Sequence, residues 1–140
     1  MISNPWLAAA GGLSAAASVT HLAIIAGGPR WYEFFGAGRR MVRLAEQGSP
    51  SATWITLGIA VVLAVWAVYA FSGAELIPRL PLLKLALAAI SAVYLLRAVG
   101  YIPALFITGA PVGTFAWVSS GIVAVFAVVH MIGTLQLWRG

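Results

Sequence analysis

The chain has 140 residues, of which 62% are hydrophobic and only 8% are charged. Soluble domains carry roughly 25% charged residues, so this composition excludes an ordinary soluble domain and indicates an integral membrane protein. The net charge of +5 does not indicate nucleic-acid binding, because few residues carry it and basic residues that flank spans usually serve topology and lipid headgroups. The absence of cysteine excludes disulfides, thiol nucleophiles and iron–sulfur clusters.

Four apolar stretches are long enough to cross a bilayer, which takes about 20 helical residues. They are expected at residues 5–26, 51–71, 81–107 and 114–138. Asn4 is a natural N-cap, Pro5 suits a first helical position, and Pro103 is expected to kink or end the third span. The first residues lack a basic region, so no cleaved signal peptide is expected. The sequence therefore predicts an all-α fold, a four-helix membrane bundle forming one transmembrane domain over 1–140.

The connection at residues 27–50 differs from the others because it mixes arginines with aromatic and aliphatic residues. It is too short and too charged to be a span. We expect an amphipathic or re-entrant segment that lies at the membrane interface. The alternative is an ordinary surface loop with aromatic anchors.

Four spans place both termini on one side of the membrane, here called the terminal side, and place segment 27–50 on the opposite side. Basic residues occur on both sides, so their number does not decide the orientation. Arg79, Lys84 and Arg139 lie directly against span ends, which favours cytoplasmic termini. We expect a multi-pass protein of a cell inner membrane.

Arg97 is the one cation well inside a predicted span. A guanidinium in hydrocarbon costs several kcal/mol unless it is paired, hydrated or able to reach the interface. A rise of ~1.5 Å per residue puts Arg97 and His21 ~24 Å from the terminal side, and His130 only ~12 Å from it. At ~3.6 residues per turn, Tyr94, Arg97 and Tyr101 share one face of the third span.

Two polar layers follow from these depths. The layer near the opposite side is a candidate ligand site, and the deeper layer is a secondary polar cluster. The candidate ligand-binding residues are His21, Glu33, Tyr94, Arg97, Tyr101 and Ser119, and the secondary layer comprises Ser14, Ser91 and His130. We hypothesise that Glu33 pairs with Arg97. The alternative for each residue is hydrogen bonding that only holds neighbouring spans together.

The pattern favours an accessory or structural membrane protein that binds a lipid or another anionic amphiphile near one membrane face. Two alternatives stay open: a membrane enzyme acting on a lipid-like or quinone-like substrate, with no catalytic residue assignable, and a small oligomeric transporter. The expected partners are membrane lipids, a small amphiphilic ligand and, as an open possibility, further copies of the chain, but no nucleic acid. No metal or cofactor is expected, because His21 and His130 differ in depth by ~12 Å and no glutamate lies within a span. Haem ligation from one side only stays open.

One segment carries a resemblance. Residues 31–38, WYEFFGAG, together with Ser72-Gly73-Ala74 and Leu80-Pro81-Leu82, resemble a family of small four-span bacterial inner-membrane proteins whose activity is uncharacterised. The resemblance implies the four-span topology and draws attention to Glu33. It implies no activity, substrate or cofactor.

Overall fold

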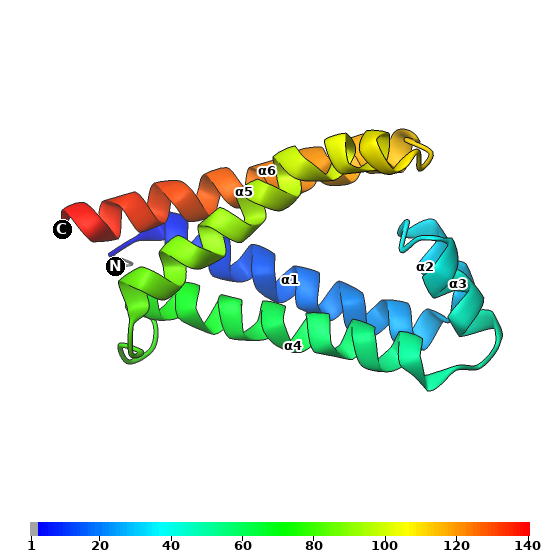
Figure 1. The fold of residues 1–140 in the computed structure, drawn as a ribbon. Coiled ribbons are helices and arrows are strands. Elements are labelled where there is room, and N and C mark those ends of the chain that lie inside the picture. The colour runs from blue at the N-terminus through cyan, green and yellow to red at the C-terminus, as the bar shows by residue number, and fades with distance from the viewer. Residues whose placement is uncertain (1–2) are drawn as a thin grey trace. The chain divides into compact units, whose positions relative to one another are not determined.

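The structure is a computed structural model that describes residues 3–140. It contains six helices and, among those residues, no strand (Figure 1). The helices are α1 (Pro5–Gly27), α2 (Pro29–Phe34), α3 (Arg39–Glu46), α4 (Pro50–Gly73), α5 (Leu83–Thr108) and α6 (Thr114–Arg139). Four of them, α1, α4, α5 and α6, are long and apolar enough to cross a membrane. The chain is therefore an all-α, multi-pass membrane protein, as its composition predicts.

Local sequence rules account for where the helices begin and end. The Asn4 side-chain oxygen accepts a hydrogen bond from the Leu7 N–H at 3.1 Å, which confirms the predicted N-cap of α1. Helix α5 begins at Leu83, two residues later than expected, because Leu82 has a left-handed backbone (φ 54°) that no α-helix accommodates. Pro103 lies inside α5, which continues to Thr108, so the proline does not end this span.

The chain divides into two compact units. Unit 1 comprises Met1–Ser14 and Trp66–Gly140, and unit 2 comprises Ala15–Val65. The division passes through α1 and α4, so each of these helices contributes one part to each unit.

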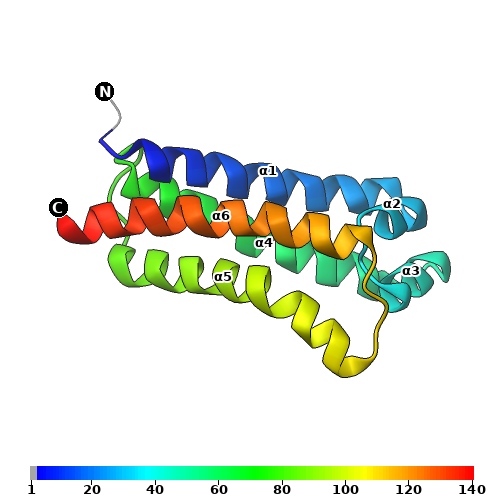
Figure 2. The ribbon, with the colours of Figure 1, turned by 90° about the horizontal axis from the view of Figure 1, so that it is seen from above.

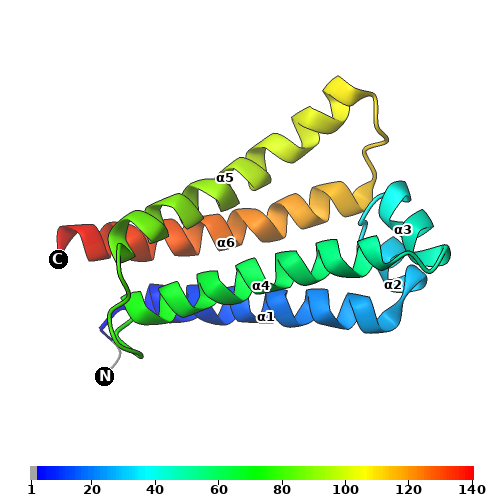
Figure 3. The ribbon, with the colours of Figure 1, turned by 60° about the horizontal axis from the view of Figure 1, so that its bottom comes forward.

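Unit 1 is a bundle of four helices: the first part of α1, the last part of α4, and the whole of α5 and α6. Small residues let its helices approach closely. Leu7 is fully buried, and a Cβ added at Gly133 would lie 2.7 Å from its Cγ and 3.0 Å from its backbone nitrogen. Figures 2 and 3 show that α5 and α6 lie close together at the end with Leu83 and Arg139 and diverge towards the connection at 109–113.

Unit 2 contains the remaining parts of α1 and α4 with α2 and α3 between them along the chain. The Ser18 hydroxyl donates to the Ala60 carbonyl at 2.7 Å and so joins α1 to α4. The Tyr32 hydroxyl of α2 donates to the Ala52 carbonyl at 3.1 Å and accepts from the Thr56 hydroxyl at 3.0 Å. These bonds fix α2 against the first turns of α4.

Helix α3 is amphipathic. Its apolar side chains pack with Phe35 against a small core formed by Ile24, Tyr32 and Ala52. They are Met41, Val42, Leu44 and Ala45. Its arginines, Arg39, Arg40 and Arg43, are exposed. The 27–50 connection is thus two short helices that share one apolar core, and its position at a membrane surface stays a prediction.

Candidate functional site

A buried polar cluster of three side chains lies within unit 1, formed by Ser14 of α1, Tyr94 of α5 and His130 of α6. The Ser14 hydroxyl lies 2.7 Å from the Tyr94 hydroxyl and 3.2 Å from His130 Nε2. Ser14 and His130 are fully buried, and Tyr94 is 6% exposed. We call these three residues the buried cluster.

The hydrogen bonds of the buried cluster form a chain with one consistent direction. His130 Nδ1 lies 2.7 Å from the Phe126 carbonyl, which only accepts, so in the neutral imidazole this nitrogen carries the proton. His130 Nε2 then accepts from Ser14, whose oxygen accepts from Tyr94. Each of these polar side-chain atoms therefore has a partner.

Aromatic rings enclose the buried cluster. The Tyr94 ring lies 5.0 Å from the Trp66 ring, 5.5 Å from the Phe126 ring and 4.6 Å from the His130 ring, measured between centroids. A serine beside an imidazole nitrogen is also how a nucleophile and its base are arranged. Both side chains are fully buried, and their hydrogen bonds join α1, α5 and α6.

Ser91 belongs to a separate bond near the terminal-side end of α5 and α6. Its hydroxyl donates to the Leu87 carbonyl at 2.8 Å and lies 3.2 Å from the Thr134 hydroxyl. Since the Ser91 hydroxyl proton is donated to the Leu87 carbonyl, the Thr134 hydroxyl is the donor of the second bond. This pair joins α5 to α6 without involving Ser14 or His130.

The second polar cluster of unit 1 surrounds Arg97 of α5, and we call it the Arg97 cluster. The guanidinium carbon lies 3.9 Å from the centroid of the Tyr101 ring, which is a cation–π contact. Nη2 donates to the Ser119 hydroxyl of α6 at 3.4 Å, and that hydroxyl donates to the Ala116 carbonyl at 3.2 Å. Nη1 is buried and has no hydrogen-bond partner among the described residues of its unit.

The Arg97 cluster lies towards the end of unit 1 that carries the 109–113 connection. The Arg97 backbone is about 21 Å along α5 from Leu83, at ~1.5 Å per residue. Ser119, which its guanidinium reaches, is only about 7.5 Å from the start of α6 by the same rise. The long side chain therefore carries the charge from the middle of α5 towards the membrane surface, as buried arginines in spans commonly do.

The structure brings together some of the predicted ligand-binding residues, gives one a different partner, and leaves the grouping of those in unit 2 as a prediction. Arg97, Tyr101 and Ser119 meet as expected from their depths. Tyr94 instead bonds to Ser14 of the deeper layer. His21, whose Nδ1 lies 2.7 Å from the Ala17 carbonyl of its own helix, belongs to unit 2.

Glu33 is exposed on α2 of unit 2. Its pairing with Arg97 stays a prediction, as does a shared site with His21. Among residues 3–140, no group of three or more histidine, cysteine, aspartate or glutamate side chains is placed to hold a metal ion.

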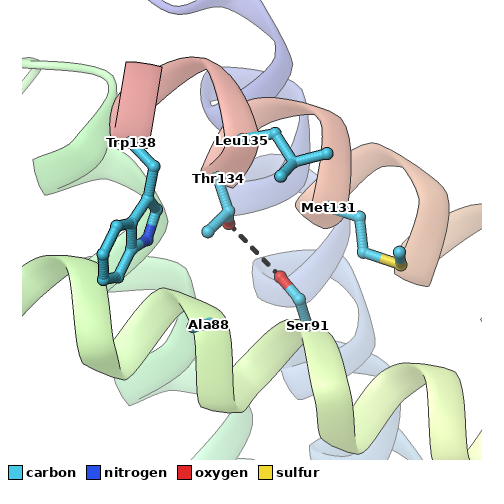
Figure 4. A pocket seen from close by; sticks show the side chains of 6 residues that line it. All are labelled: Ala88, Ser91, Met131, Thr134, Leu135 and Trp138. Carbon is cyan, nitrogen blue, oxygen red and sulfur yellow. Dashed lines mark hydrogen bonds between the residues drawn. The ribbon is translucent and has the colours of Figure 1, made fainter. Parts of the chain in front are cut away.

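Sequence reasoning missed a groove between α5 and α6, which we call the α5/α6 groove. Its volume is about 300 Å³, and it is lined by Ala88, Ser91, Met131, Thr134, Leu135 and Trp138 (Figure 4). The Ser91–Thr134 hydrogen bond crosses it, and Trp138 stands at one end and Met131 at the other. No sequence pattern could have revealed it, because it depends on how the α5 and α6 side chains meet.

The chain matches no protein-family model, no curated protein and no solved structure. The resemblance of segment 31–38 to small bacterial membrane proteins therefore stays an expectation. What these observations establish is that the chain belongs to the all-α, multi-pass membrane proteins.

Proposed function

We propose that the protein binds the anionic headgroup of a membrane amphiphile at the Arg97 cluster, in an accessory or structural role. The observation that carries this proposal is Nη1 of Arg97, a buried donor of a permanently charged group that lacks a partner within its unit. Leaving such a donor unsatisfied costs about 1–3 kcal/mol or more, so an acceptor that reaches it gains at least the usual energy of a charge-assisted hydrogen bond.

Unit 1 supplies no carboxylate for this arginine. The unit's one acidic residue is Glu75, in the connection between α4 and α5, whereas Arg97 is about 21 Å further along α5 than Leu83. The present partners, the Ser119 hydroxyl and the Tyr101 ring, are uncharged. A phosphate or carboxylate would therefore supply the missing counter-charge.

The shape of the guanidinium favours an anion for a second reason. A planar guanidinium can bind phosphate and carboxylate through two parallel hydrogen bonds, and both N–H groups of Nη1 are without a partner among the described residues of the unit.

Native mass spectrometry of the protein in a neutral detergent tests the proposal. The purified protein is titrated with phosphatidylglycerol, with phosphatidylcholine and with a long-chain fatty acid. Loss of one charge-assisted hydrogen bond corresponds to roughly a tenfold weakening, so Arg97→Gln should raise the Kd of one bound phosphatidylglycerol by about tenfold or more. Phosphatidylcholine, which has no net charge, should bind the wild type more weakly than phosphatidylglycerol does. Its Kd should be nearly the same for Arg97→Gln and the wild type.

The matched control is Arg79→Gln, which removes an exposed arginine of the same unit outside the Arg97 cluster. Its affinity for phosphatidylglycerol should stay within about twofold of the wild type, as expected for an exposed charge. The fatty-acid titration distinguishes a carboxylate ligand from a phosphate ligand. Equal affinities of Arg97→Gln and Arg79→Gln for both anionic amphiphiles would overturn the proposal.

A further inference from the structure

The α5/α6 groove lies at the other end of the helix pair from the Arg97 cluster. It extends from Trp138, next to the last residue of α6, back to Met131, about 10 Å along the helix axis. Both helices are membrane spans, so whatever fills the groove comes from the hydrocarbon of the bilayer or from another helix. Its exposed walls are apolar, and Leu135 and Trp138 are each about half exposed (52% and 48%).

No polar group of the groove needs a polar ligand. The Ser91 and Thr134 hydroxyls bond to each other, and Ser91 donates to its own helix at Leu87. The Trp138 ring nitrogen donates to the Lys84 carbonyl at 3.3 Å. An aliphatic chain is therefore the ligand that matches the groove along its length.

The charged side chains that α5 and α6 place at the end of the groove are positive. The Lys84 ammonium lies 5.6 Å from the centroid of the Trp138 ring, and Arg139 follows directly. Neither α5 nor α6 contains an acidic residue. Lys84 precedes the groove residue Ala88 by one helical turn, so its charge stands at the membrane-surface end of the groove.

The length of the groove decides between a lipid chain and a second protein helix. A partner helix would need a continuous surface along most of the ~30 Å hydrocarbon core. The groove covers about 10 Å, which lies within the half of the bilayer next to Lys84 and Arg139. One acyl chain of a lipid in that leaflet fits a groove of this length, and the phosphate of that lipid would lie at the basic end.

We infer that the α5/α6 groove is a binding site for an anionic phospholipid of the terminal-side leaflet. One acyl chain lies between Ala88 and Leu135, and the phosphodiester contacts Lys84 and Arg139 beside the Trp138 ring. This site is separate from the Arg97 cluster and does not depend on the function proposed for it. Tryptophan and lysine at the end of a span are the residue types that meet lipid headgroups.

Electron paramagnetic resonance of spin-labelled lipids tests the inference on the full chain in vesicles. The probes are phosphatidylglycerol and phosphatidylcholine, each labelled on an acyl chain, and the measured quantity is the fraction of probe with restricted motion. The wild type should restrict phosphatidylglycerol more strongly than phosphatidylcholine. In an Arg97→Gln background, which removes the other proposed anion site, Lys84→Gln combined with Arg139→Gln should bring the ratio of the two association constants to about one, because both charges attract the anionic headgroup.

A second variant tests the groove rather than its charge. Ala88→Phe places a ring in the groove and should reduce the restricted fraction of both lipids, whereas Ala89→Phe, on the exposed face beside it, should not. If Ala88→Phe fails to fold, the charge variant alone decides. A preference for phosphatidylglycerol that survives Lys84→Gln with Arg139→Gln in the Arg97→Gln background would overturn the inference, and so would equal effects of Ala88→Phe and Ala89→Phe.

The two lipid proposals fail separately. In native mass spectrometry with phosphatidylglycerol, the wild type should retain two lipids, and Arg97→Gln and Lys84→Gln should each retain one. Retention of the same number by Lys84→Gln and the wild type overturns the groove site, whatever Arg97→Gln does.

Discussion

The buried cluster and the Arg97 cluster lie close together on α5 and differ in one respect that decides their roles. Tyr94 and Arg97 are three residues apart on the same helix. The buried cluster pairs each of its polar side-chain atoms and is closed to solvent and lipid. The Arg97 cluster leaves Nη1 without a partner in its unit. A polar residue inside a span is thus better judged by whether its hydrogen bonds are complete than by its chemical type.

The direction of the side chains explains how the two clusters separate. In a helix the Cα–Cβ bond points towards the N-terminus, so the Tyr94 ring leans towards Leu83 and meets Ser14. Tyr101 leans the same way and so comes to lie against the guanidinium of Arg97, four residues before it. Arg97 is long enough to turn towards Ser119 in the other direction.

The largest expected effect is on stability at the buried cluster. His130→Ala should lower the free energy of unfolding by about 3 kcal/mol, because it leaves a cavity in a fully buried place and removes the acceptor of the Ser14 hydroxyl. The measurement is thermal or denaturant unfolding in a neutral detergent.

His21→Ala is the matched control for that comparison. His21 is half-buried, and its side-chain hydrogen bond goes to a carbonyl of its own helix, so its loss should cost less than about 1 kcal/mol. Equal losses for the two histidine variants would contradict the assignment of His130 to packing.

The next effect has the opposite sign and concerns the Arg97 cluster. Arg97→Leu should leave the protein as stable as the wild type or stabilise it by about 1 kcal/mol in neutral detergent, because it removes a buried charge without a counter-charge in its unit. Unfolding measured with and without phosphatidylglycerol checks this.

Added phosphatidylglycerol should raise the unfolding temperature of the wild type and shift Arg97→Leu less, since a ligand stabilises only the state that binds it. If Arg97→Leu instead lost several kcal/mol without lipid, the arginine would already be paired inside the protein. The contrast between the two clusters would then fail.

The smallest effect separates the two tyrosines. Tyr94→Phe removes the hydroxyl bonded to Ser14 and should cost about 0.6 kcal/mol, the average for a hydrogen bond between spans. Tyr101→Phe keeps the ring under the guanidinium and should cost close to nothing. Unfolding of both variants under the same conditions provides the test, and a reversed order would mean that Tyr101 also bonds through its hydroxyl.

The sequence by itself determined the local features of this protein. Runs of apolar residues define the four spans because a bilayer requires about 20 apolar residues per helix. The Asn4 cap and the exceptional position of Arg97 also follow from a few neighbouring residues. The amphipathic nature of α3 is readable in the alternation of its arginines with apolar residues.

Only the tertiary structure decided which polar side chains meet. Counting residues along the helices placed Tyr94 with Arg97, whereas its hydroxyl bonds to Ser14 one layer deeper. Counting residues locates the Cα atoms. A tyrosine hydroxyl and a guanidinium lie several ångströms from the Cα atoms of their residues, and the two side chains can point in opposite directions along the helix. The α5/α6 groove was hidden for the same reason, because its walls exist only where the side chains of two helices, more than forty residues apart in the sequence, fail to fill the space between them.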